Sequence, residues 1–214
     1  MVIYNKQTEK IVYVGSETDM DMKTLHIGLF FGSFNPIHHG HLILSTHILN
    51  TTLIDEIWLV VSPQNPFKHY EDLLPETDRL SMVEKSILNN DRLRACDIEF
   101  QLPKPSYTIH TLRALQEKYP QYRFSIIMGE DNLQTLPQWK ESDIILLNHN
   151  IFVYPRQSET DIIPIEHPNI TRLNAPLLNL SSTLIRLMVK QNKSIMYMVP
   201  EAARQEILKK GYYR

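Results

Sequence analysis

The stretch that decides the fold is residues 25–41, LHIGLFFGSFNPIHHGH, in which an apolar run is followed by a glycine and then by three histidines. The run at 25–31 is short and almost wholly apolar, which is typical of a strand buried on both faces. Apolar residues recur at helical spacing over 41–53, so a helix is expected there. A strand, a loop and a helix in this order form the first unit of an α/β domain.

The same alternation continues to the C-terminus. It predicts a Rossmann-like α/β domain, a doubly wound parallel sheet with a helical C-terminal end, whose ligands lie at the carboxyl ends of the strands. The further strands are expected at 57–61, 93–100, 124–128, 151–154 and 170–173, and the further helices at 76–88, 108–119, 182–190 and 200–210.

The first 21 residues are polar and acidic and contain no motif. A new start is suggested at Met22, because MKTLHIGLFFGSF opens directly on the first strand. We therefore expect an N-terminal extension at 1–21, with a short extra strand around Lys10–Val14, and a catalytic domain at 22–214. We assign the extension no role in the chemistry.

Composition excludes several classes of protein. Lys and Arg total 22 against 24 Asp and Glu, and this net charge of -2 argues against a chain that coats nucleic acid or an anionic membrane. The single cysteine, Cys96, excludes an intramolecular disulfide. No apolar run approaches the ~20 residues that span a bilayer, and the N-terminus is too polar for a secretory signal. A cytoplasmic protein without nucleic-acid or membrane partners is expected.

The loop GSFNPIHHGH, 32–41, stands where a Rossmann sheet holds phosphate. Gly32 lets backbone N–H groups approach an anion, and Gly40 is expected to leave room for it. His38 precedes the helix and His41 lies in its first turn, so both are expected at a phosphate held by the positive helix end. No Cys, Asp or Glu within the loop completes a metal site, and none is predicted.

A second constellation is NLSSTLIR, 179–186. Ser181 is a good N-cap for the helix that follows, and Ser182 and Thr183 add hydroxyl groups to its first turn. Arg186 stands one turn above Ser182 and opposes the helix dipole, a conflict that a bound anion would remove. The alternative is a plain serine cap followed by a solvated arginine.

These two strings resemble the GxFxPxHxGH and ISSTxIR motifs of the nucleotidyltransferase superfamily. The resemblance implies that His38, His41 and Arg186 are catalytic and bind the triphosphate of ATP. Gly129-Glu130-Asp131 is similar to the superfamily's GxD nucleotide contact. The other ATP-binding residues implied are Gly32, Ser33, Phe34, Gly129, Asp131, Ser181, Ser182 and Thr183.

The acceptor is indicated by PSYTIHTL, 105–112, which resembles the SYTxxTL element of bacterial nicotinate-mononucleotide adenylyltransferases. In that family the backbone amides of the Tyr and the Thr, here Tyr107 and Thr108, meet the nicotinate carboxylate. A helix start capped by Ser106 is compatible with this role. Trp139 resembles the tryptophan that stacks on the pyridine ring, and a core tryptophan is the alternative.

Two further elements match the family less closely. PQNPFK, 63–68, is similar to its PxxPHK loop and implies that Lys68 meets phosphate, although Phe67 replaces the usual histidine. Arg156 resembles the arginine of the RPG element, but Gln157 and Ser158 follow it. We place both Lys68 and Arg156 among the substrate-binding residues, and the role of Arg156 stays open.

The resemblance implies adenylyl transfer from ATP to nicotinate mononucleotide, giving deamido-NAD and pyrophosphate. His38, His41, Lys68 and Arg186 are expected to supply positive charge together with Mg²⁺, which enters with ATP and needs few protein ligands. Nicotinamide mononucleotide or phosphopantetheine are alternative acceptors, and a non-catalytic nucleotide-sensing module is a further alternative. Oligomeric state is not determined, and a homo-oligomer stays open.

Overall fold

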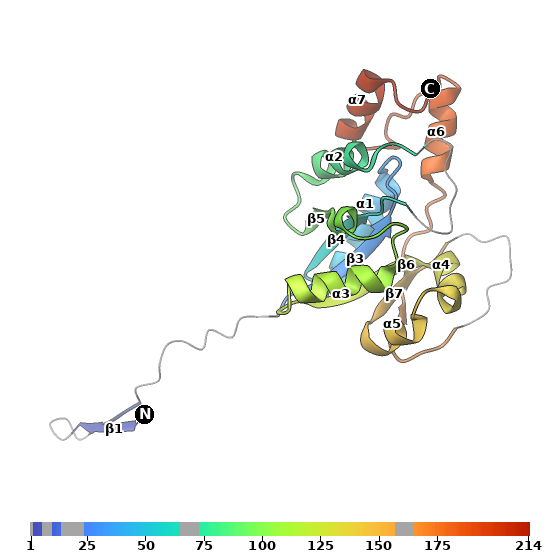
Figure 1. Cartoon of the computed structure of the whole chain (residues 1–214). Coiled ribbons are helices and arrows are strands. Elements are labelled where there is room, and N and C mark those ends of the chain that lie inside the picture. The colour runs from blue at the N-terminus through green and yellow to red at the C-terminus, as the bar shows by residue number, and fades with distance from the viewer. Residues whose placement is uncertain (1, 6–9, 14–23, 65–72, 157–164) are drawn as a thin grey trace.

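The computed structural model describes residues 2–5, 10–13, 24–64, 73–156 and 165–214. Its centre is a six-stranded parallel sheet with the strand order β5-β4-β3-β6-β7-β8 (Figure 1). Counted from β3, this is the order 3-2-1-4-5-6 of a doubly wound sheet, so the predicted fold class is confirmed. The strands are β3 (His26–Gly32), β4 (Glu56–Val61), β5 (Leu93–Cys96), β6 (Arg123–Gly129), β7 (Ile151–Tyr154) and β8 (Ile170–Arg172).

Helices cover both faces of the sheet, because the strands are apolar on both. In β4, Ile57 and Leu59 belong to the core under α1, α2, α6 and α7, whereas Trp58 and Val60 point to the core under α3, α4 and α5. The helices are α1 (His39–Thr51), α2 (Glu76–Ile87), α3 (Thr108–Lys118), α4 (Glu130–Thr135), α5 (Ser142–Asn148), α6 (Ser182–Lys190) and α7 (Glu201–Lys210), with 3₁₀ turns η1 (Ile98–Gln101) and η2 (Leu136–Gln138).

Two regions differ from the prediction. The third strand was expected to reach residue 100, but β5 ends at Cys96 and the chain turns at Asp97 into η1. The helices α4 and α5 and the turn η2 were not predicted. They are short, and α5 buries only Ile145 while Leu147 is 73% exposed, so no apolar stripe marks them in the sequence.

The N-terminal segment forms a separate hairpin, in which β1 (Val2–Asn5) pairs antiparallel with β2 (Lys10–Tyr13). The extra strand expected around Lys10–Val14 is therefore confirmed for residues 10–13, and Val14 lies outside the described residues. None of the helices in the described ranges is long and apolar enough to cross a membrane.

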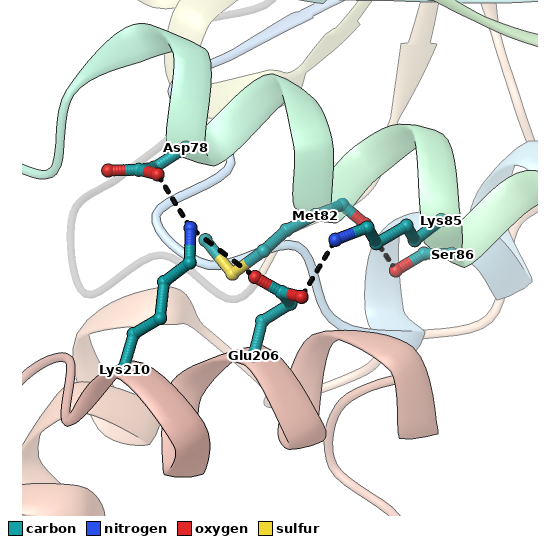
Figure 2. A network of polar contacts seen from close by, with 6 residues as sticks. All are labelled: Asp78, Met82, Lys85, Ser86, Glu206 and Lys210. Atoms are coloured by element: carbon teal, nitrogen blue, oxygen red, sulfur yellow. Dashed lines mark hydrogen bonds and ion pairs between the residues drawn. The ribbon is translucent and has the colours of Figure 1, made fainter.

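The C-terminal helix α7 is held against α2 by a row of charges (Figure 2). Lys210 pairs with Asp78 at 3.0 Å, and Glu206 accepts a 2.7 Å hydrogen bond from Lys85. Beyond the helix, the buried hydroxyl of Tyr213 donates to Asn35 Oδ1 at 2.8 Å. The end of the chain is thereby tied to the loop that follows β3.

Candidate active site

The switch point of the sheet lies between β3 and β6. The chain leaves β3 toward α1 on one face and leaves β6 toward α4 on the other, so a crevice opens at their carboxyl ends. Two cavities lie here, one of about 560 Å³ and one of about 110 Å³. Phe30 and Tyr154 line both of them, so these two rings separate adjoining chambers.

The larger cavity joins the two motifs that lie about 140 residues apart in the sequence. Its lining includes His38, His41 and Ser181. The motifs also bond directly, because Ser182 Oγ donates to the carbonyl of Pro36 at 2.8 Å and Arg186 Nη1 donates to the carbonyl of Asn35 at 2.9 Å. Arg186 therefore reaches back to the histidine loop, and the alternative of a freely solvated arginine is wrong.

The histidine pair is ordered by the start of α1. His38 is the N-cap and His41 lies in the first turn, as predicted, and the two rings stack with centroids 3.7 Å apart. The backbone N–H of His38 donates to Nδ1 of His41 at 3.2 Å. A neutral His41 therefore carries its proton on Nε2, where it can donate to a ligand.

Both histidines are uncharged at neutral pH in this structure. Burial, together with the nearby positive charge of Arg156, lowers the pKa of His38 to about 4. Burial also holds the pKa of His41 well below its ordinary value, and the nearby His38 adds to this. Desolvation therefore leaves two neutral imidazoles in this structure, and the expectation that the pair supplies positive charge to a bound triphosphate stays a prediction.

Gly40 lines the larger cavity, and its lack of a side chain also matters for the histidine pair. A Cβ atom there would stand 2.9 Å from Nδ1 of His38, so Gly40 makes room for the histidine ring, and its predicted role of leaving room for a phosphate stays a prediction. Phe34, implied as an ATP contact, is 1% exposed and packs edge-on against His41 at 5.0 Å. Its side chain packs against the ring of His41 and lines neither cavity.

Asp131 and Arg156 form an ion pair of 2.9 Å in the larger cavity. Arg156 was placed with the acceptor, but the structure puts it beside the histidines instead. A Cβ atom at Gly129 would collide with the Asp131 carboxylate and come within 3.0 Å of Arg156 Cδ. A side chain at this strand end would therefore force the ion pair to shift.

The start of α6 is built as predicted. Ser181 Oγ accepts a hydrogen bond from the backbone N–H of Leu184 at 3.1 Å and caps the helix. Thr183 is exposed, and its hydroxyl accepts from Arg186 at 3.4 Å. The N-termini of α1 and α6 thereby both border the larger cavity, where their dipoles favour an anion.

The smaller cavity contains the residues expected at the acceptor. Tyr107, Thr108 and Trp139 line it together with Gly32 and Ser33, which the sequence had assigned to ATP. Tyr107 is the N-cap of α3, so the first N–H groups of that helix have no partner within it. The expected serine cap is wrong, since Ser106 makes no capping hydrogen bond.

Trp139 is half-buried. Its indole N–H donates to Thr135 Oγ1 at 3.2 Å, and its ring packs partly against the core and partly along the cavity. Its partial packing against the core fits the core alternative, and stacking on a pyridine ring stays a prediction. Lys68 and Phe67 lie outside the described residues.

Three residues of the site were missed by the sequence analysis. Arg79 of α2 is wholly buried and donates to the carbonyls of Ser33, Ser62, Pro63 and Leu74, which join the loops after β3 and β4. The sequence does indicate that Arg79 is unusual, because this charged residue lies on the apolar face of its helix with Met82 and Val83. Glu99 and Lys140 line the smaller cavity and carry no comparable signal.

Comparison with known proteins agrees with this geometry. The sequence model of the Cytidylyltransferase-like family matches residues 29–188, which places the chain in the class of nucleotidyltransferases. A probable nicotinate-nucleotide adenylyltransferase of Cytophaga hutchinsonii is 51% identical over 88% of this chain and 98% of its own. One of Flavobacterium johnsoniae is 44% identical over 89% and 100%. The chain therefore belongs to the nicotinate-nucleotide adenylyltransferase family.

A solved structure supports the fold. The nicotinic acid mononucleotide adenylyltransferase of Plasmodium falciparum, complexed with NaAD, superposes with a TM-score of 0.73 at 22% identity, covering 88% of this chain and 97% of that one. The same protein complexed with APC gives a TM-score of 0.71.

Proposed function

We propose that the protein transfers the adenylyl group of ATP to nicotinate mononucleotide, giving deamido-NAD and pyrophosphate. The observation that carries this proposal is the pair of adjoining chambers at the switch point, separated by Phe30 and Tyr154. One chamber has two helix N-termini and the histidines, which suits a triphosphate. The other has the start of α3 and an indole ring, which suits a pyridine carboxylate. Family membership supports the proposed reaction.

The reaction needs two phosphates brought together rather than a strong base. An oxygen of the mononucleotide phosphate attacks the α-phosphorus of ATP in line, the bond to the bridging oxygen breaks, and pyrophosphate leaves. Because the attacking phosphate is already ionised, positioning and charge stabilisation dominate the catalysis.

The residues of the two motifs have separate tasks in this scheme. His41 donates Nε2–H to the phosphoryl group, and its tautomer is set by the backbone of His38. A bound triphosphate raises the pKa of both histidines, since a nearby negative charge favours the cation. Arg186, held by the carbonyl of Asn35, faces the departing pyrophosphate from the start of α6.

We also propose that Mg²⁺ accompanies the triphosphate. Within the described ranges no three His, Cys, Asp or Glu side chains gather into a metal site, and Asp131 is engaged by Arg156. This donor set fits an ion that is held chiefly by phosphate oxygens and water, as Mg²⁺ often is. The ion would neutralise charge on the phosphates.

The test is release of pyrophosphate from ATP with nicotinate mononucleotide, nicotinamide mononucleotide or phosphopantetheine as acceptor. We expect turnover to be fastest with nicotinate mononucleotide. Faster turnover of either other acceptor would contradict the acceptor assignment. ATP binding without pyrophosphate release in any mixture would favour a nucleotide-sensing module.

A further inference from the structure

The smaller cavity contains a buried carboxyl group that the proposed reaction does not use. Glu99 of η1 is 1% exposed and lines this cavity. Its Oε1 accepts a 2.7 Å hydrogen bond from the hydroxyl of Thr111 on α3. Its Oε2 has no hydrogen-bond partner among the described residues, and neither does Oγ of the adjacent Ser106. A buried polar atom without a partner is costly, so a ligand group is the natural occupant.

The position of this carboxyl group ties it to the acceptor. Thr111 lies one turn along α3 from Tyr107, and Ser106 directly precedes Tyr107. The unpartnered Oε2 therefore belongs to the same corner as the helix start expected to meet the pyridine substituent. We propose that Glu99 selects the acid form of the mononucleotide by donating a proton on Oε2 to the nicotinate carboxylate. This inference rests on the proposed function.

The surroundings of Glu99 favour its neutral form. Burial raises the pKa of this carboxyl above its usual value, and the nearby hydroxyl groups of Thr111, Ser62 and Ser106 only partly offset the effect. No cation in the described part of the chain forms an ion pair with it. The titratable groups that face it or share its cavity are Cys96 of β5, a thiol whose pKa burial raises to about 11, Tyr107, Lys140 and Tyr154.

The Thr111 hydroxyl decides which oxygen carries the proton. Because Oε1 already accepts that hydrogen bond, the proton of a neutral Glu99 belongs on Oε2, toward the cavity. Two ionised carboxylates in contact repel strongly, whereas one proton shared between them binds both. An ionised Glu99 would instead accept from the NH₂ of nicotinamide. The charge state of Glu99 thus sets the preference between acid and amide.

This scheme makes selectivity depend on pH with a known sign. Nicotinate mononucleotide binds only when Glu99 is protonated. The ratio of kcat/KM for nicotinate over nicotinamide mononucleotide therefore falls by about tenfold for each pH unit above the pKa of Glu99. Glutamine at this position keeps an acceptor for Thr111 and presents a permanent N–H donor. In Glu99→Gln the ratio should therefore favour the acid and stay flat with pH.

The experiment measures this ratio between pH 5 and 9 for the wild type, Glu99→Gln, Lys140→Gln and the exposed α3 control Glu117→Gln. Both mononucleotides carry the same phosphate, so the effect of its ionisation on kcat/KM cancels in the ratio. We expect the ratio to fall with rising pH in the wild type and in Glu117→Gln. In Lys140→Gln it should fall in the same way but start from a lower value, because a cation that lines the cavity is lost. The assignment would be overturned if the wild-type ratio did not change with pH, or if the ratio in Glu99→Gln changed with pH as steeply as in the wild type. It would also be overturned if Glu99→Gln lowered kcat/KM equally for both acceptors.

A second measurement uses the wild type alone. Calorimetry at pH 8 in buffers of different ionisation enthalpy should show more proton uptake with nicotinate mononucleotide than with nicotinamide mononucleotide, and equal uptake would overturn the role of Glu99. Wild type that turns over neither mononucleotide would overturn the proposed function and this inference together. Turnover of the acid with an unchanged Glu99→Gln slope would overturn this inference alone.

Discussion

The stacked histidines show how a single residue's chemistry depends on its burial. His41 has its Nδ1 occupied by a backbone N–H, so only Nε2 is available to substrate. We expect His41→Ala to lower kcat by about 10² to 10³ while changing the KM for ATP far less, because the contact forms mainly in the transition state. Steady-state kinetics beside His47→Ala, which lines neither cavity, provide the measurement. A near wild-type kcat would refute this role.

His38 should also make stability depend on pH. Its pKa is about 4 in the folded protein, below the ordinary value of 6.5 that it regains on unfolding. The unfolded chain therefore binds the proton first, and the free energy of unfolding falls as pH drops from about 6.5 to 4, by about 3 kcal/mol in total. Above pH 7 this residue contributes no pH dependence.

Urea unfolding at pH 7, 5.5 and 4.5 tests this linkage. The variant His38→Gln should lose less stability over that interval than the wild type does. A parallel decline in both proteins would place the pH dependence elsewhere.

Trp139 should matter for both mononucleotides alike, because an indole face does not sense the acid group. Loss of a stacked aromatic ring costs about 1–3 kcal/mol, so Trp139→Ala should lower kcat/KM for each acceptor by about 5- to 150-fold. The measurement is kcat/KM with both acceptors. A variant that loses only the acid substrate would show that stacking is not what Trp139 provides.

At the scale of elements, Arg79 is the residue that joins the loops. From α2 its guanidinium holds four carbonyls, among them those of Ser33 and Ser62, which both border the smaller cavity. Arg79→Met should lower the free energy of unfolding by about 3–5 kcal/mol, since carbonyls bound to a buried charge lose their donor. It should also raise the KM for the mononucleotide.

Unfolding and kinetics of Arg79→Met are compared with Lys85→Met, an exposed position on the same helix whose ion pair contributes little. Equal stability of the two variants would argue against this role. The sequence predicted every strand of the main sheet and the helices α1, α2, α3, α6 and α7, because most of these elements have their own apolar period. It missed α4 and α5, which are short and held by tertiary contacts.

At the scale of the whole molecule, the hairpin of β1 and β2 pairs only with itself among the described strands. Both cavities are lined by residues from 30 onward. We therefore expect deletion of residues 1–21 to leave kcat/KM for both substrates unchanged. Purified truncated protein that folds, as judged by circular dichroism, and yet has no activity would show that the segment completes the site.

The sequence by itself determined the order of the main-sheet strands, the loop at 32–41 between a strand and a helix, and the serine-capped helix start at 182, because these depend on residues close together in the chain. Only the tertiary structure decided the charge of His38 and His41, the partners of Arg186 and the importance of Arg79 and Glu99. Desolvation is the sum of many neighbours contributed by distant segments. No local pattern reports it, so the chemistry of the site became visible only when the sheet brought those segments together.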